Sequence, residues 1–436
     1  MNLKIANVGK VRLASIAVDG ITVVAGDNGA GKSTLGRCLT TYANAIRQMD
    51  SLVRNRRINK FISALVSNLG LSEFAEHYLT VYAYRNSESM NILAPESWDS
   101  PEKVRQILTA AAGMYQEEKP LQKKLAEKPI EANEIVRALQ AINDEPFALY
   151  EQQVLDDRFR SSFKKQISPL ADKDAKGYVT IFESGESEDA YKVGFEGNKV
   201  VSIPSAVRYQ LPQVIYIEPL HALDLGVERA ARPFWGRTLR ALERYGAGDL
   251  DLDSIIANRN FDVKYEDEAE KNAVLTLVED LVRIIRGGME EVDESLMFKE
   301  RFDNDNSAFV ELENLASGAK TMSVVIHALR NGSLRRNRML VVDEPESNLH
   351  PGWQVKFAHL LVLLHKRLGV KVLLNTHSPY FLKTIEYYAE KEKVDGSTNF
   401  YLMKKEHDGP LYNVEGCTGN TNVIFETMYE PFKEIM

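Results

Sequence analysis

A stretch that could bind phosphate lies close to the start of the chain. Residues 26–34 read Gly-Asp-Asn-Gly-Ala-Gly-Lys-Ser-Thr and fit the phosphate-binding pattern G-x-x-x-x-G-K-[ST] at every fixed position. Glycines allow the backbone to curl so that successive N–H groups, and the N-terminus of the next helix, point at phosphate oxygens. Lys32 would reach the β- and γ-phosphates, and the Ser33 hydroxyl would ligate Mg²⁺. The residues expected to bind a nucleoside triphosphate are Gly26, Asn28, Gly29, Gly31, Lys32, Ser33 and Thr34.

Two carboxylates at the end of a hydrophobic segment could complete such a site. Residues 339–342 are apolar and lead directly into Asp343 and Glu344. A buried parallel strand that ends in acids places them at the sheet edge where open α/β proteins bind ligands. We therefore expect Asp343 to help hold Mg²⁺ and Glu344 to polarise the attacking water.

Two further segments give weaker signals. Residues 370–375 predict another buried strand, and His377 follows it. A histidine at a strand end is more often structural, but here His377 could contact a γ-phosphate or position the water. Ser317 and Gly318 stand before an apolar helical segment, residues 322–329. By itself this pair indicates no more than a helix N-cap, for which serine is common.

The elements that must position these residues predict an α/β protein. Two or three short strands in the first 25 residues lead into the phosphate loop, and a helix follows Ser33. Apolar residues at helical spacing, interrupted by prolines, predict helical insertions, the second of them extending from Leu223 to about Met297. The predicted segments are a first core lobe at 1–40, a helical insertion at 41–176, a β hairpin and core strand at 177–222, a second helical insertion at 223–298, a second core lobe at 299–403 whose last strand is 400–403, and a tail at 404–436 that we expect to pack on the core.

Composition limits the classes of protein to which the chain can belong. Its 436 residues predict two or three folded units, and 44% hydrophobic with 27% charged residues is ordinary for a globular protein. A net charge of −8 argues against a uniformly basic coat for nucleic acid. The two cysteines, Cys38 and Cys417, form no ligand cluster, which fits a reducing compartment. No apolar run approaches the roughly 18 residues that span a bilayer. We therefore expect a cytoplasmic protein with no membrane partner.

Taken in order, these elements resemble those of ABC-class ATPases of the kind found in SMC, RecF and OLD proteins. The resemblance implies an ABC-type ATPase head, in which a mixed P-loop sheet with an antiparallel β subdomain carries two helical insertions. The run Asp-Glu-Pro-Glu-Ser-Asn-Leu-His-Pro at 343–351, with Thr-His-Ser-Pro at 376–379, is similar to the OLD-like branch in particular. Residues 26–33 match the Walker A motif, 315–320 resemble the signature motif, 340–344 match Walker B, and His377 matches the switch histidine.

The resemblance also implies a site shared between two copies. In this family two heads meet head to tail around ATP and Mg²⁺, and the signature of one closes over the ATP held by the other. Ser317 and Gly318 would therefore bind the nucleotide of the partner, in a homodimer or a higher oligomer built from dimers. The signature reads Ala-Ser-Gly-Ala-Lys here, so these two residues carry over more safely than Lys320. The glutamine loop stays open among Gln152, Gln153, Gln166 and Gln213.

The biological role has two main hypotheses. The first is a sensor or regulatory ATPase of an antiphage system, similar to those of OLD, Septu or PARIS defences, that acts with a separate nuclease or toxin effector. The alternative is a DNA-repair or chromosome-maintenance ATPase, similar to RecF or SMC proteins, that binds DNA directly. Its contacts would be the basic stretches at 54–60 and 335–338, although a charge run is usually a solvated face. Intact Lys32, Asp343 and Glu344 argue against a third reading, an interaction module with a degenerate site.

Overall fold

The chain forms two compact units in a computed structural model. One unit contains Met1–Arg47, Leu155–Ala231 and Leu250–Met436, and the other contains Gln48–Val154 and Arg232–Asp249. The borders of the predicted insertions remain predictions. The structure describes residues 1–69, 141–142, 144–206, 211–217, 263, 265–292, 295–302, 306–311, 317–347, 349–407 and 409–430.

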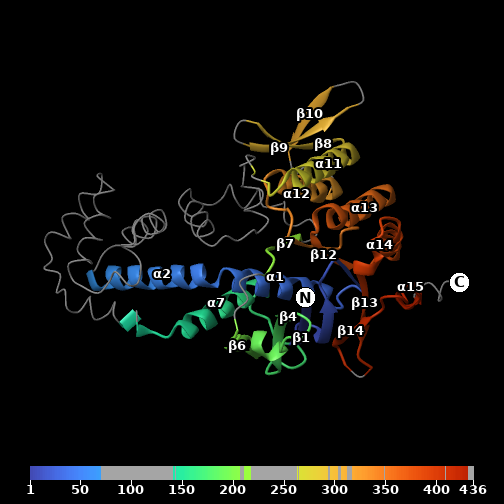
Figure 1. Ribbon diagram of the computed structural model, residues 1–436. Helices are drawn as coiled ribbons and strands as arrows, with labels where there is room; N and C mark the ends of the chain where they lie inside the picture. The colour runs from blue at the N-terminus through green and yellow to red at the C-terminus, as the bar shows by residue number, and fades with distance from the viewer. Residues whose placement is uncertain are drawn as a thin grey trace, which may run out of the picture. The chain divides into compact units, whose positions relative to one another are not determined.

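A large mixed sheet dominates the first unit, and it confirms the predicted fold class (Figure 1). The order of its eleven described strands is β6-β5-β4-β1-β2-β14-β13-β3-β12-β11-β7. Strands β13, β3, β12, β11 and β7 run parallel, whereas β6, β5, β4, β1 and β2 pair antiparallel. The strands are β1 (Asn2–Val8), β2 (Val11–Ala17), β3 (Ile21–Ala25), β4 (Lys176–Phe182), β5 (Lys192–Glu196), β6 (Lys199–Ser202), β7 (Val214–Ile217), β11 (Met339–Asp343), β12 (Lys371–Thr376), β13 (Thr398–Lys405) and β14 (Tyr412–Gly416).

The parallel half of the sheet is covered by helices, which explains its composition. Every residue of β3 and β11 is buried, as expected for strands packed on both faces. Helix α1 packs against β7, β11 and β12, while α13 and α14 contact β12 and each other. The described helices are α1 (Lys32–Arg47), α2 (Met49–Leu69), α7 (Phe147–Ser162), α11 (Glu268–Ile285), α12 (Ser317–Arg330), α13 (Pro351–Leu368), α14 (Pro379–Lys391) and α15 (Asn422–Tyr429), with short 3₁₀ turns η3 (Glu188–Tyr191) and η5 (Asp395–Ser397).

The second predicted insertion is only partly helical where the structure describes it. Helix α11 ends at Ile285, and Arg286 adopts a left-handed conformation with φ of 53°. Strands β8 (Gly287–Val292), β9 (Ser295–Arg301) and β10 (Ser307–Glu311) then form a separate antiparallel sheet next to α11 and α12 (Figure 1). The expectation of helix to about Met297 is wrong because Gly287 and Gly288 disfavour a helix. A Cβ on Gly287 would stand 2.4 Å from the Phe298 ring, so the close pairing of β8 with β9 requires glycine there.

The C-terminal region contains one strand more than the sequence predicted. Residues 400–403 lie in β13, but β14 follows it, antiparallel to β13 and parallel to β2. The alternation Tyr-Asn-Val-Glu in β14 covers only four residues, and none of its five residues is buried, so its pattern is only a weak signal for a strand. Helix α15 then packs on the core through Ile424, which is fully buried. Residues 431–436 lie outside the described residues.

Candidate functional site

The phosphate loop joins β3 to α1, as its sequence predicted. Gly26, Gly29 and Gly31 have φ of 151°, 74° and 99°, a region that side chains with a Cβ rarely adopt. Space also requires glycine. A Cβ on Gly26 would stand 2.8 Å from the Cβ of Met403, and one on Gly31 would stand 3.2 Å from the Cβ of Lys10. The loop is therefore shaped by the strand β13 and by the turn between β1 and β2.

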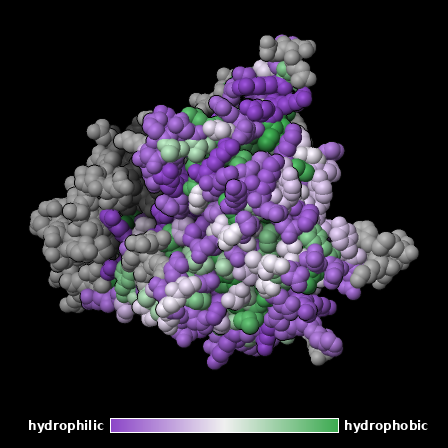
Figure 2. Space-filling view, turned by 45° about the vertical axis from the view of Figure 1, so that its right-hand side comes forward, coloured by the Kyte–Doolittle hydropathy of each residue, from purple (hydrophilic) through white to green (hydrophobic). Residues whose placement is uncertain are grey.

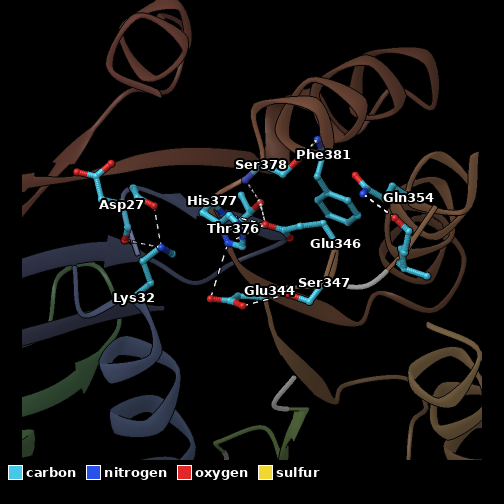
Figure 3. Close-up of polar contacts among 12 residues, drawn as sticks. Asp27, Lys32, Glu344, Glu346, Ser347, Gln354, Thr376, His377, Ser378 and Phe381 are labelled. Carbon is cyan, nitrogen blue, oxygen red and sulfur yellow. Dashed lines mark hydrogen bonds and ion pairs between the residues drawn. The ribbon is translucent and has the colours of Figure 1, made fainter. Parts of the chain in front are cut away.

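Lys32 is folded back onto this loop. Its side chain is buried, and its Nζ donates hydrogen bonds to the carbonyl oxygens of Gly26 at 2.7 Å and Asp27 at 2.8 Å (Figure 3). Burial lowers the pKa of the Lys32 ammonium, and the nearby carboxylates of Glu344 and Asp343 oppose that lowering. The ammonium is thus held at the mouth of the loop by carbonyls that a phosphate could replace.

Asp343 is the last residue of β11, which β12 separates from β3 in the sheet. Its two carboxylate oxygens differ in their hydrogen bonding. Its side chain is 5% exposed, and its Oδ2 accepts a hydrogen bond from the Tyr216 hydroxyl at 3.1 Å. Among the described residues its Oδ1 has no hydrogen-bond partner. A buried carboxylate oxygen without a partner requires an explanation, and a hard cation that prefers oxygen ligands is one that fits.

Glu344 follows directly in an unusual backbone conformation. Its φ is 46°, and its backbone N–H donates to the carbonyl of Asn375 at 2.8 Å across the β11–β12 edge. Its Oε2 accepts from the Ser347 hydroxyl at 3.0 Å, while Oε1 lies 3.7 Å from Nδ1 of His377. A left-handed non-glycine residue costs of order 1–2 kcal/mol and persists where the surroundings fix it. In this backbone conformation the carboxylate of Glu344 lies next to the ring of His377.

Glu346 is a site residue that the sequence reading left without a role. It is 6% exposed, and its Oε1 accepts hydrogen bonds from the Thr376 hydroxyl at 2.7 Å and from the backbone N–H of His377 at 2.9 Å (Figure 3). The same oxygen lies 3.4 Å from Nδ1 of His377. Burial raises the pKa of Glu346, although the Thr376 hydroxyl and His377 favour its charged form. The only sequence signal was an acid in the loop after the Asp-Glu pair.

Asn375 and Lys10 were also missed. Asn375 is fully buried at the end of β12, and among the described residues neither its Nδ2 nor its Oδ1 has a hydrogen-bond partner. The Lys10 ammonium lies 3.4 Å from where a Cβ on Gly29 would stand, so it borders the phosphate loop. An asparagine after a strand and a lysine in a turn are ordinary residues, and only their neighbours in space mark them.

The structure leaves the signature motif and the glutamine loop as predictions. Ser317 and Gly318 begin α12, but residues 312–316 and the side chains of 317–320 lie outside what is described. Gln213 precedes β7, at the amino ends of the parallel strands and thus opposite the phosphate loop. Gln166 is exposed, and Gln153 accepts a hydrogen bond from Arg56 at 2.9 Å. His377, Glu344, Asp343 and Lys32, in contrast, lie in one neighbourhood.

A glycine-rich loop joins the buried parallel strand β3 to a helix, and β11, one strand removed from β3 in the sheet, ends in Asp343 with Glu344 directly after it. This arrangement defines a P-loop ATPase fold. The family model described as "AAA domain, putative AbiEii toxin, Type IV TA system" matches residues 21–383. The chain belongs to this family.

Comparison with other known proteins adds distant structural matches. No curated protein matches the chain. Among solved structures it is similar to an SmcHead bound to the C-winged helix domain of ScpA, at 10% identity over 96% of this chain and 97% of that one, with a TM-score of 0.40. It is also similar to an SMC head domain from Thermotoga maritima, at 10% identity over 95% and 97%, with a TM-score of 0.33. A likeness of this degree assigns no activity or partner.

No helix in the described part of the chain is both long and apolar enough to cross a membrane. Among the same residues, no group of three or more His, Cys, Asp or Glu side chains could hold a metal ion. Proteins commonly bind Mg²⁺ through one or two carboxylates together with substrate phosphates, and such a site needs no cluster of this kind.

Proposed function

We propose that the protein is a Mg²⁺-dependent ATPase. The observation that carries this proposal is the meeting of Lys32, Asp343 and Glu344 at the carboxyl ends of the parallel strands β3 and β11, which β12 separates in the sheet. The residues fit the ligand. The loop glycines leave the backbone open to phosphate, and Lys32 donates hydrogen bonds to the loop carbonyls of Gly26 and Asp27. Within the part of the chain that the structure describes, Oδ1 of Asp343 has no hydrogen-bond partner. Bound Mg²⁺ and ATP would supply a polarised γ-phosphoryl group.

The residues of the chain would then divide the work. Lys32 would exchange its carbonyl partners for phosphate oxygens, and Ser33 with Asp343 would hold the cation. Glu344 takes the proton of the attacking water, with its orientation fixed by Ser347 and by the constrained backbone. His377 lies between Glu344 and Glu346 and orients the water or contacts the γ-phosphate.

The finer proposal is that two heads dimerise head to tail around ATP. The helix that begins at Ser317 and Gly318 would offer its N-terminal N–H groups to the γ-phosphate bound by the other copy. The bound nucleotide would then hold the two heads together, and its hydrolysis would let them separate. A motion of this kind, rather than the phosphate released, would be the useful output.

For the biological role we favour a regulatory subunit of an antiphage system with a separate effector. The contacts of the basic stretches support this over direct DNA binding. In the second unit, Lys60 pairs with Glu145, and the side chains of Arg57 and Lys60 each lie 5.6 Å from the centroid of the Tyr150 ring. In the first unit, Arg336 pairs with Asp267 at 2.8 Å. These cations have structural partners, whereas a phosphate-binding surface needs cations available to DNA.

Steady-state ATP hydrolysis, titrated with double-stranded and single-stranded DNA, tests both levels of the proposal. We expect Mg²⁺-dependent turnover that Glu344→Gln reduces by about 100- to 10,000-fold while ATP binding persists. Near-normal turnover in that variant would remove Glu344 from the mechanism. A rate that ignores DNA supports a protein partner, while a salt-sensitive, several-fold stimulation would move the DNA-repair alternative ahead.

A further inference from the structure

A cleft of about 400 Å³ lies between α11 and α13, with Glu392 at the end of α14 on its border. Its floor is apolar and consists of Ile284, Leu360 and Leu363. Leu360 and Leu363 are 2% and 7% exposed, so they form a surface that is continuous with the core. Its described lining includes no residue of the phosphate loop and none of the residues 343–346. The cleft is therefore a separate feature from the nucleotide site.

The rim of this cleft is basic. It carries four Lys or Arg side chains and two carboxylates, in a chain whose net charge is −8. Asp280 is shared by Arg367 at 3.4 Å and Arg283 at 3.7 Å, and Glu392 is shared by Lys366 at 2.6 Å and His359 at 3.0 Å. The excess of two positive charges makes the opening attractive to carboxylates.

Two cations of the rim are the most available. Lys356 is exposed and forms no ion pair with any residue that the structure describes. The side chain of Arg283 is 78% exposed. It lies 3.7 Å from Asp280, farther than Arg367, which lies 3.4 Å from the same carboxylate. Among the lining residues, His359 stacks on the ring of Tyr388 at 4.0 Å, and Tyr388 in turn meets the exposed ring of Tyr387. An aromatic group at the rim of an apolar floor is typical of protein interfaces.

The surroundings favour a protein segment over a large apolar partner face. On the face shown in Figure 2, hydrophobic residues form small separate areas among hydrophilic ones. At the cleft itself, charged side chains surround the three aliphatic residues of the floor, so a partner that binds there must supply charge around a small apolar contact. A floor of three aliphatic side chains accommodates one or two apolar side chains, and the rim then requires carboxylates next to them.

We propose that this cleft docks an acidic segment of a different protein, with apolar side chains on Leu360 and Leu363 and carboxylates on Lys356 and Arg283. This proposal specifies the chemistry of the separate effector named in the proposed function. Only its biological meaning rests on that function. Docking does not require hydrolysis, so loss of turnover in Glu344→Gln leaves it unchanged. The two proposals can therefore fail separately.

Fluorescence polarisation of a short labelled peptide of alternating glutamate and leucine, added to the full-length protein, tests the proposal. We expect the double variant Lys356→Glu/Arg283→Glu to bind it at least about tenfold more weakly, since a like charge opposes the carboxylates. Lys271→Glu is the matched control. It reverses an exposed charge on α11 outside the cleft and should leave binding unchanged.

Peptide controls keep the test independent of protein folding. On the wild-type protein, replacing leucine by alanine or glutamate by lysine should each abolish binding, and added salt should weaken it. Equal binding of the lysine peptide, or equal affinity in the double variant, would overturn the proposal. Analytical sedimentation of the same variants tests whether a second copy of this chain occupies the cleft instead. If charge reversal at Lys356 and Arg283 dissociates a wild-type oligomer, the cleft holds a second copy of this chain and the proposal is wrong.

Discussion

Replacing Gly36 with alanine tests how closely the helix after the phosphate loop packs on the strand that carries the carboxylates. Gly36 is buried in α1. A Cβ there would stand 2.8 Å from Cγ1 of Val341 in β11 and 3.0 Å from Cε2 of Tyr216 in β7. The first distance is shorter than carbon atoms tolerate, so the helix must move away from the sheet or the two side chains must shift.

The structure gives the size of the effect. Overpacking of this kind costs about 1–3 kcal/mol, and the better helix propensity of alanine returns about 1 kcal/mol. We expect a net loss of about 1 kcal/mol, which corresponds to a decrease of about 2 °C in the thermal midpoint. The functional effect should be larger. Lys32 lies on the same helix, Val341 lies two residues before Asp343, and Tyr216 donates to Asp343.

Gly352→Ala provides the matched control. Gly352 is an exposed residue of α13, and a Cβ there would stand 3.5 Å from Nδ1 of His350, an ordinary contact. Because Gly352 lies in the first turn, where helix propensity counts for less than in the interior, this variant should stay within about 0.5 kcal/mol of the wild type. Thermal melts and the affinity for a fluorescent ATP analogue, with and without Mg²⁺, measure both variants. Gly36→Ala should bind several-fold more weakly with Mg²⁺. If it melts like the control and binds like the wild type, the close packing does not set the geometry of the site.

Three other predictions follow from single residues. Lys32→Ala should abolish binding of the ATP analogue, and retained tight binding would refute the phosphate-loop assignment. Ser317→Arg should lower turnover by blocking closure across the dimer while each copy still binds nucleotide, so an unchanged rate argues against a shared site. Burial raises the folded-state pKa of Glu346 above its unfolded value, so its contribution to stability is present below about pH 4.5 and is lost as pH rises through the folded pKa. Glu346→Gln removes this loss, so the thermal midpoint of the variant should exceed that of the wild type at neutral pH and converge on it in acid. Its turnover should be slower. An equal difference between the two thermal midpoints at every pH would contradict the argument.

The sequence by itself determined the local parts of the site. The phosphate loop is contiguous, its glycines and Lys32 have fixed spacing, and β3 before it is a short, β-branched run that is apolar except for Thr22. The same holds for β11 with Asp343 and Glu344 at its end. Such motifs can be read from sequence because neighbouring residues create both the backbone shape and the chemistry.

Only the tertiary structure decided which distant residues complete the site. Lys10 borders the loop, Tyr216 holds Asp343, and Glu346 holds Thr376 and His377, although no sequence spacing connects these residues. The strands missed by the sequence reading have the same cause. β14 is stabilised by pairing with β13 and β2, because its short Tyr-Asn-Val-Glu alternation is not buried. β8 begins with two glycines and is stabilised by pairing with β9. Hydrogen bonds between strands depend on partners that the fold brings together, and a local pattern carries no record of them.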